Sequence, residues 1–435
     1  MGFASWIKDA RERDTEDIQD VVKKYYHRVR PVLRISLSLF NTQGYWLHFN
    51  LVYGFLVYCI VLGLEATLIF SINKFEDNVD LMIITCHHAV IGGFTLGMNT
   101  CFIYKRRNFS KMLEMMKSRL HDYKDDPVLH TTKGRALKAA EWFVHEVMSF
   151  FPILIVGFVF GVKRIFTIIF PSDVNVTETG INYLVAHPIY CPTEGFSSVF
   201  YVCEIAEVVF VIQSASAVAS VCSLYVIHCI FLITELDYLR LSVANFESRV
   251  KCRLKRTDGR KMPFLKQKMQ ECASDCLVEN IKHHHAIKKY FDQLNDMMST
   301  TIFIGYGCGT FTMGLAMMKL FTKKENQKLD VGNTSLIGLL FMFEIVFMLV
   351  VSYFGEMITT NAHRVFEQLR FMRLDKFTGV KFRKTLLMFT IGMQKPMQLD
   401  AGGFSKCNME TFASVMNVAY SMLNIAAAAK NETDK

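Results

Sequence analysis

A regularly spaced set of small and polar residues lies near the C-terminus, in the apolar segment 409–429. About 21 residues at about 1.5 Å each give a helix of about 30 Å, long enough to cross a bilayer. A membrane helix with one polar side needs water or a polar neighbour there, so we predict that this helix lines an aqueous pore. The same spacing also occurs where membrane helices pack together, and that alternative stays open. Small or polar side chains recur every three or four positions on one face of this helix: Ser414, Asn417, Ser421, Asn424 and Ala428.

A second group of candidate residues lies on helical faces of the earlier apolar segments and predicts a cavity for a small hydrophobic ligand. Within it His87 and Glu204 stand out, because an ionisable group inside a membrane is costly and tends to mark function. Glu344 is similarly placed, but the sequence assigns it no role. Ordinary helix packing, with the histidines bonded to neighbouring carbonyls, is the alternative. The predicted ligand-binding residues are Ile84, His87, His88, Ile91, Ile153, Gly157, Phe160, Tyr201, Glu204, Ile205, Val208 and Phe311.

The chain carries no motif of an enzyme. It has no glycine-rich phosphate loop, no H-E-x-x-H and no G-x-S-x-G, so we predict no catalytic residues and no cofactor. Cys272 and Cys276 lie one helical turn apart near the consecutive histidines 283–285, a grouping that could hold a metal. A solvated cytoplasmic helix face is the favoured interpretation, and no metal is predicted.

The candidate pore and ligand-binding residues all fall within long apolar blocks of the sequence. The chain is 51% hydrophobic, and its blocks are close to or above the roughly 18–20 residues that a spanning helix needs. We therefore predict an all-α membrane protein with seven transmembrane helices and helical cytoplasmic extensions. The blocks lie at 50–72, 81–104, 143–170, 196–235, 300–321, 335–357 and 409–429.

The basic residues predict the orientation of these helices. Of the 49 Lys and Arg residues, 8 lie in 1–43, 10 in 105–141, 13 in 236–299 and 8 in 358–404. Basic residues favour the cytoplasmic side, so the N-terminus is predicted inside and the C-terminus outside. No signal peptide precedes the first block, so the first span must insert the chain. A charge sorted by side of the membrane also argues against a nucleic-acid partner.

Three glycosylation motifs agree with this orientation. Asn175, Asn333 and Asn431 each begin an N-x-Ser/Thr motif and fall on segments predicted to be extracellular. A fourth motif at Asn108 falls on the cytoplasmic side and is expected to stay unmodified. Asn175, Asn333 and Asn431 are therefore the predicted glycosylation sites.

The predicted organisation follows from these spans. Residues 44–357 form a six-helix bundle that holds the ligand cavity, with long cytoplasmic helical loops. Residues 358–408 alternate basic and apolar side chains and predict a cytoplasmic anchor segment. The other segments are a cytoplasmic N-terminal segment at 1–43, a pore-lining helix at 409–429 and an extracellular tail at 430–435.

The C-terminal third resembles the insect odorant receptor family. The resemblance is carried by Gln394-Lys395-Pro396, by Ala401-Gly402-Gly403-Phe404, by Met409-Glu410-Thr411-Phe412, and by Ala419-Tyr420-Ser421. The order and spacing of these motifs match the end of that family, over about 40 residues. The seven predicted spans extend the match loosely to the whole chain.

The resemblance implies a cation channel opened by volatile ligands and assembled as a tetramer with a shared co-receptor. It implies a plasma-membrane protein of olfactory sensory neurons whose final helix lines the pore, and whose odorant binds in the outer half of the bundle. It also implies a gate at Ile425 and Ala428, where the co-receptor has an apolar residue and a glutamine. Ala428 cannot replace that amide. The co-receptor's longer second cytoplasmic loop is not seen here, which favours a ligand-tuned subunit.

Two other receptor classes are the alternatives. A G-protein-coupled receptor also has seven helices, but it should have an extracellular N-terminus, an acid-Arg pair that ends the third span and Asn-Pro in the seventh. This chain has Lys163-Arg164 after its third span and no proline in the last one. A gustatory receptor channel should end in Thr-Tyr, five residues and Gln-Phe, whereas Ala419-Tyr420 is followed by Ala426-Ala427.

Overall fold

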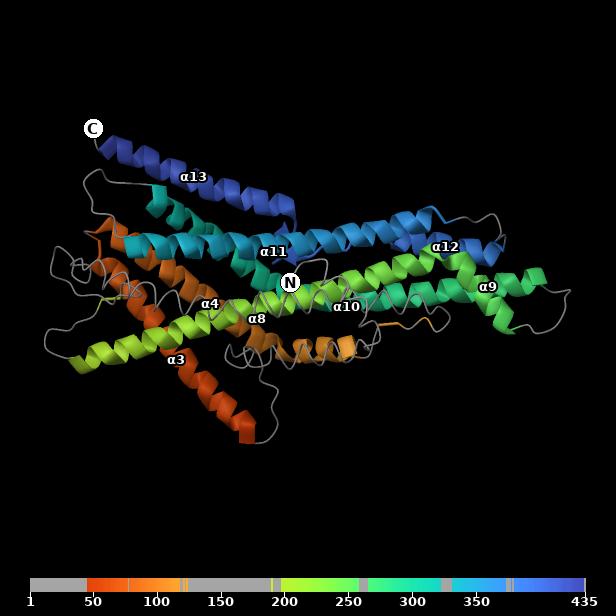
Figure 1. Cartoon of the computed structure of the whole chain (residues 1–435), viewed down its shortest axis with the longest axis horizontal. Coiled ribbons are helices and arrows are strands. Elements are labelled where there is room, and N and C mark those ends of the chain that lie inside the picture. Colours follow the sequence, from red (N-terminus) through yellow and green to blue (C-terminus); the bar gives the residue numbers. More distant parts are fainter. Residues whose placement is uncertain are drawn as a thin grey trace, which may run out of the picture.

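The structure, a computed structural model, describes residues 45–76, 78–117, 120–121, 123, 189–190, 197–257, 265–321, 331–372, 377 and 379–433. The described part is almost entirely helical (Figure 1). Its elements are α3 (Tyr45–Lys74), α4 (Val79–Lys117), α8 (Ser197–Ala244), α9 (Phe246–Thr257), α10 (Leu265–Phe321), α11 (Val331–Arg370), α12 (Val380–Gly392), β1 (Asp400–Ala401), β2 (Ser405–Lys406) and α13 (Met409–Thr433).

Five of the described helices are long and apolar enough to cross a membrane, namely α3, α4, α8, α10 and α11. The all-α membrane architecture predicted from the sequence is therefore confirmed. The predicted span 143–170 lies outside the described residues. The block 409–429 falls within α13, whose 25 residues give a length of about 38 Å. The count of seven spans and the sides of the two termini stay predictions.

The helices differ in how they meet their surroundings. α8 is apolar on all sides, and most of its side chains from Phe210 to Val243 are buried against α3, α4, α10 and α11. A helix that is hydrophobic all round belongs in the interior of a bundle. α3 instead exposes large apolar side chains, among them Phe55 at 70% and Ile69 at 55%. Such a surface suits contact with lipid.

α10 is the central element of the fold. Its 57 residues pack against α4, α8, α9, α11, α12, α13 and β1. The predicted span 300–321 is therefore only the last part of a much longer helix, and the predicted cytoplasmic segment 236–299 continues α8 and α10 as helices. Long helices with few prolines were expected for this segment. The largest hydrophobic core cluster of the described residues runs along this axis.

A short hairpin joins α12 to α13 and is tied to α10. β1 and β2 pair antiparallel, Asp400 with Lys406 and Ala401 with Ser405. Gly402 and Gly403 form the turn with φ of 65° and 76°, a conformation that glycine adopts without strain. The Asp400 carboxylate accepts hydrogen bonds from Asn295 Nδ2 at 2.6 Å and from the Ser299 hydroxyl of α10. The turn also donates from Gly402 N to the Ser299 carbonyl at 3.0 Å.

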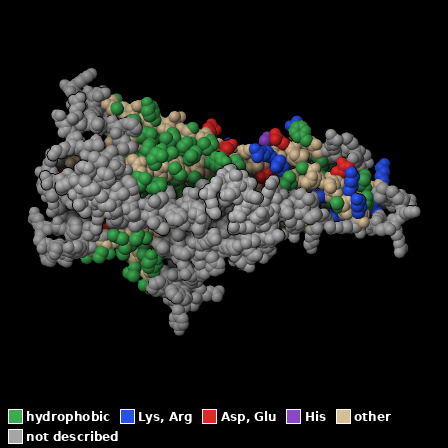
Figure 2. All heavy atoms as spheres, in the orientation of Figure 1, with side chains coloured by type: hydrophobic (Ala, Val, Ile, Leu, Met, Phe, Trp, Pro, Cys, Tyr) green, Lys and Arg blue, Asp and Glu red, His purple; other side chains and the backbone are tan. Residues whose placement is uncertain are grey.

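Basic side chains of the described residues are most numerous near one end of the molecule, although the Lys319–Asp80 ion pair lies towards the other. In Figure 2, Lys and Arg side chains cluster where α9 and α12 lie, whereas the described side chains towards the other end are mainly hydrophobic. This separation is the one expected of a membrane layer joined to a water-side layer. In α12 the side chains of Phe382, Leu386 and Phe389 are buried, and the cytoplasmic anchor role of 358–408 stays a prediction.

A buried polar network joins α8, α9 and α10 near this charged end. Arg249 is fully buried and donates to Ser242 Oγ, to Asn280 Oδ1 at 3.0 Å and to Glu279 Oε2 at 2.7 Å. Its guanidinium carbon lies 4.3 Å from the centre of the Tyr123 ring.

His283 extends this network on the other side of Tyr123. Its Nε2 lies 2.8 Å from Glu235 Oε2 and its Nδ1 lies 2.9 Å from the Tyr123 hydroxyl. Cys272, Cys276 and His283 are all buried. The solvated face predicted for these three residues is therefore wrong. The helix is amphipathic there, and this side packs into the bundle.

Candidate ligand-binding site

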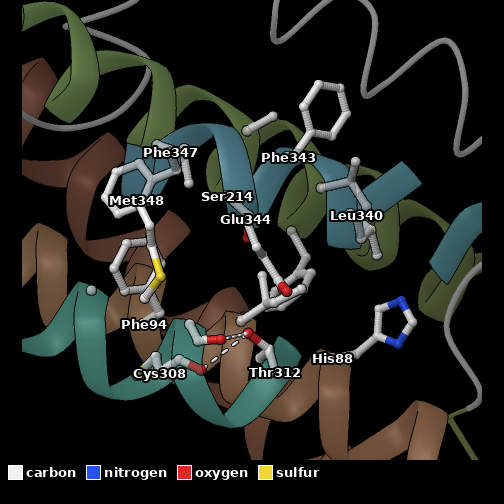
Figure 3. Close-up of a pocket in the computed structure, with 17 residues that line it drawn as sticks. His88, Phe94, Ser214, Cys308, Thr312, Leu340, Phe343, Glu344, Phe347 and Met348 are labelled. Carbon is white, nitrogen blue, oxygen red and sulfur yellow. Dashed lines mark hydrogen bonds between the residues drawn. The ribbon is translucent and has the colours of Figure 1, made fainter. Parts of the chain in front are cut away.

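A cavity lies between α4, α8, α10 and α11, inside the apolar half of the bundle (Figure 3). About 130 Å³ of it is open to the centres of water-sized molecules. One water molecule needs about 10–15 Å³ on this measure, so the cavity has room for roughly ten water-sized groups. The lining residues are His88, Ile91 and Phe94 of α4; Phe210, Val211, Ser214, Ala215 and Val218 of α8; Gly305, Cys308, Gly309 and Thr312 of α10; and Leu340, Phe343, Glu344, Phe347 and Met348 of α11.

The lining is aromatic and apolar, and glycines of α10 make room for it. Phe94 and Phe347 meet edge to face with ring centres 5.9 Å apart. A Cβ at Gly309 would lie 2.7 Å from Met348 Cε, and one at Gly305 would lie 3.1 Å from the Phe347 ring. The two glycines therefore let α11 side chains approach the α10 backbone. A cavity of this kind binds small hydrophobic molecules.

Glu344 is the acidic group of the cavity. Its Oε1 lies 3.0 Å from Nε2 of His87, which is itself buried on α4. Its Oε2 is buried and has no hydrogen-bond partner among the described residues, and the same holds for Ser214 Oγ. A carboxyl group held inside an apolar bundle by one histidine is costly, which makes Glu344 a candidate functional residue.

The other polar lining groups bond to their own helices. His88 Nδ1 lies 2.8 Å from the Ile84 carbonyl. Thr312 lies close to Glu344, but its hydroxyl donates its hydrogen to the carbonyls of Cys308 at 3.0 Å and Gly309 at 3.1 Å. Figure 3 shows the two Thr312 bonds as dashed lines. The cavity thus offers polar contacts chiefly through Glu344 and Ser214.

The structure brings the four predicted residues of α4 to this region. His88 and Ile91 line the cavity, and His87 holds Glu344 from outside the lining. Ile84 is buried with Ala316 and Ile337, beyond the cavity. His88 is therefore part of the cavity wall, whereas His87 holds a carboxyl group that lines the cavity.

The predicted residues of the other helices are not among the described lining residues. Ile205, Val208 and Phe311 are 65%, 37% and 45% exposed, which places them on the outer surface of α8 and α10. Tyr201 and Glu204 lie in α8, but their side chains fall outside the described set. Ile153, Gly157 and Phe160 lie outside the described residues altogether. α8 turns the face of Phe210, Ser214 and Val218 to the cavity instead.

α13 presents the predicted pore stripe to the outside of the chain. It packs on α10 and α11 through a face that includes the buried Val415 and Ala419. Two stripe hydroxyls are bonded within the helix, Ser414 to the Glu410 carbonyl and Ser421 to the Asn417 carbonyl. The stripe residues and the gate positions are all exposed: Ser414, Asn417, Ser421, Asn424, Ile425 and Ala428.

The predicted glycosylation sites lie at helix ends or outside the described residues. Asn333 is in the first turn of α11 and Asn431 in the last turn of α13, although neither side chain is described. Asn175 is not among the described residues. The two helix ends are at the same end of the bundle in Figure 1.

Comparisons with known proteins agree with this architecture. A family model described as 7tm Odorant receptor matches residues 89–420. The structure of the insect olfactory receptor OR5 from Machilis hrabei in complex with eugenol is similar to this chain, with a TM-score of 0.74 and 13% identity over 95% of this chain and 100% of that one. A second structure of that receptor has a TM-score of 0.70 and 13% identity over 94% and 99%. No curated protein sequence matches the chain.

Proposed function

Because the chain belongs to the 7tm odorant receptor family, we propose that it is the odorant-tuned subunit of a cation channel that a small hydrophobic odorant opens. The apolar cavity between α4, α8, α10 and α11 is the observation that carries this proposal. Aromatic walls suit a volatile apolar molecule, and a few polar groups can orient it. The chain shares its fold with an olfactory receptor whose structure contains eugenol, which supports a ligand site within the bundle.

The proposed pore is lined by α13. In the proposed assembly the chain forms a tetramer with a shared co-receptor in the plasma membrane of olfactory sensory neurons, and each subunit contributes its last helix. Support comes from the exposure of Asn417, Ser421 and Asn424, which leaves this polar face available to a central water-filled channel. Ile425 is the proposed hydrophobic constriction. Ala428 stands where the co-receptor has a glutamine, so this subunit contributes no amide to the polar ring at that level of the pore.

Co-expression is the direct test of the channel. The chain together with the co-receptor should give odorant-gated cation current, whereas the chain alone should give little or none. A panel of small apolar volatiles serves as the stimulus, because the cavity does not single out one odorant. Normal surface expression without current for any member of the panel would contradict the proposal.

Two substitutions test the pore separately. Ile425→Ala removes the proposed constriction and Asn424→Ala removes an amide from the wet wall, so both should alter ion selectivity or gating. Val415→Ala, on the buried face of α13, is the control. Unchanged permeation in both pore variants, at normal surface expression, would return the stripe to a packing role.

The ligand site is tested at His87. His87→Ala removes the partner of Glu344 and should shift ligand sensitivity without a change in ion permeation. Of the other residues predicted as binding, His88 and Ile91 are the proposed contacts on α4. No shift for any active odorant would exclude His87 from the site.

Glycan mapping tests the orientation. We propose that Asn175, Asn333 and Asn431 face the outside, with Asn175 the most accessible to modification. Modification at Asn175 would support a cytoplasmic N-terminus. Modification of a motif inserted near residue 15 would overturn it and favour the G-protein-coupled arrangement.

A further inference from the structure

We infer that the cavity selects odorants that carry a hydrogen-bond donor, such as phenols and alcohols, and that Glu344 accepts this bond. The inference rests on the proposed ligand site and adds the chemical class of the ligand. It does not follow from the apolar walls, which would accept any hydrophobic volatile of suitable size. It follows from two polar atoms that line the cavity and lack partners among the described residues, Glu344 Oε2 and Ser214 Oγ.

The geometry of the Glu344 carboxyl sets the direction of the bond. Oε1 is engaged with His87 Nε2 at 3.0 Å, so Oε2 is the atom left for a ligand. If the proton between them lies on His87, Glu344 is ionised and Oε2 is a carboxylate acceptor. If the proton lies on Oε1, Oε2 is a carbonyl acceptor. In both of these forms Oε2 accepts a hydrogen bond from the ligand, whereas a proton on Oε2 itself would make it a donor, which the comparison of a phenol with an anisole would reveal.

The residues around the carboxyl leave this role open. Thr312 is close by, but its hydrogen goes to the carbonyls of Cys308 and Gly309. Ser214, on α8, is 8% exposed and can donate to a ligand oxygen while that oxygen donates to Glu344. A hydroxyl-bearing ligand can therefore satisfy both protein atoms at once. A pure hydrocarbon would bury them unpaired, which costs affinity.

The position of the carboxyl favours the same ligands. Glu344 Oε2 lies inside the bundle, where a hydrogen bond to a ligand is electrostatically stronger than in bulk water. The ligand loses its own bonds to water, which partly offsets this gain. We expect a net preference of about tenfold, the size of one good hydrogen bond in a protein interior.

Binding of three matched volatiles tests the inference. Full-length protein in lipid nanodiscs is titrated with para-ethylphenol, with para-ethyltoluene, in which a methyl replaces the hydroxyl, and with para-ethylanisole, which can only accept. Affinity is read from the ligand-dependent rise in Tm, with empty nanodiscs as the control for partition into lipid. This readout needs no channel opening and no co-receptor.

The ratio of the Kd of para-ethyltoluene to that of para-ethylphenol is the deciding quantity, because partition into lipid cancels when variants are compared. Glu344→Leu should lower this ratio about tenfold, and Ser214→Ala by about threefold. Glu344→Gln should keep most of it, because the amide oxygen still accepts. Glu65→Leu is the matched control, since Glu65 is a buried carboxyl of α3 that is not among the lining residues.

The outcomes separate this inference from the proposed function. An unchanged ratio in Glu344→Leu, or a wild-type preference for para-ethylanisole over para-ethylphenol, would overturn the inference and leave the ligand site intact. If Glu344→Leu does not fold, Ser214→Ala and the wild-type comparison of phenol with anisole decide. Binding of none of the three compounds would overturn both the ligand site and the inference. Odorant-gated current with the co-receptor is measured independently.

Discussion

Two buried regions of the molecule differ in how many hydrogen bonds hold their polar side chains. In the network between α8, α9 and α10, Arg249 makes three hydrogen bonds and also stacks over Tyr123, while His283 bridges Glu235 and Tyr123. In the cavity between α4, α8, α10 and α11, the Glu344 carboxyl is held by His87 through one oxygen only. The network thus joins three helices through several bonds, although Arg249 Nε and Asn280 Nδ2 have no partner among the described residues, whereas the cavity holds its carboxyl through a single bond.

The difference separates stability from recognition. An unpaired buried polar group costs about 1–3 kcal/mol, so the loss of a residue that makes several bonds should cost more stability than the loss of a residue that makes one. In the proposed ligand site, a bound hydrogen-bond donor would relieve the cost of leaving Glu344 Oε2 unpaired. Changes in the network should therefore act on folding, and changes in the cavity should act on binding.

The largest expected effect is the loss of Arg249. Arg249→Met removes the hydrogen bonds to Ser242, to Asn280 and to Glu279, which then keeps only Arg253 as its donor among the described residues, and should lower the free energy of unfolding by about 3 kcal/mol. Chemical denaturation of the purified protein measures it. Arg253→Met is the matched control, because Arg253 also binds Glu279 but is 22% exposed, so its loss should cost about 1 kcal/mol or less. If the two variants lost the same free energy of unfolding, the stabilising role assigned to Arg249 would be wrong.

A smaller effect is expected from filling the cavity. Gly309→Val places methyl groups where Met348 Cε already lies 2.7 Å from the Cβ position, so Met348 must move into the ligand space. We expect about a tenfold loss of odorant sensitivity with little loss of stability. Dose-response curves of current measure it. Gly307→Val is the control, because a Cβ at Gly307 meets nothing within 4 Å. Equal sensitivity in the two variants would contradict the cavity assignment.

A smaller, pH-dependent effect is expected from His121, whose ring stacks on that of His283 in the network with ring centres 5.4 Å apart. Burial, and next the charge of His283, lower the pKa of His121 from 6.5 to about 4. Between these two pH values the unfolded chain binds a proton that the folded chain does not. Stability should therefore fall as the pH is lowered from about 6.5 to 4. Tm measured against pH tests this, and His121→Gln should flatten the curve in that window. Parallel curves for the two proteins would exclude His121.

The helices were largely predictable because uninterrupted apolar blocks of spanning length are typical of membrane helices and rare in soluble folds. Their continuation was harder to place, since α10 runs for 57 residues through what the sequence divides into a cytoplasmic segment and a span. The hairpin 400–406 was missed. Gly402-Gly403 is a turn signal, but the flanking strands have two residues each and carry no alternating pattern.

The cavity was predictable only in part. His88 and Ile91 follow from a face of α4 that places polar groups in a span. α8 is apolar on every side, so periodicity cannot tell that Ser214 rather than Ile205 faces inward. Glu344 carried a signal, because a carboxyl inside a span needs a reason. Its pairing with His87, far away in sequence, appears only when α4 and α11 are brought together.

Hydrogen bonds of Asp400 with Asn295 and Ser299 attach the hairpin to α10, and the hairpin leads directly into α13. The start of α13 is therefore linked to α10. A tilt of α10 at the cavity would carry the last helix with it, over a lever of about 15 Å between Gly309 and Ser299. The response to an odorant would then depend on the difference between its affinities for the two tilts, and not on how tightly it binds. Two volatiles of equal overall affinity that prefer different tilts would then act as agonist and antagonist, and a mixture of the two would reveal a preference that binding of either one alone does not.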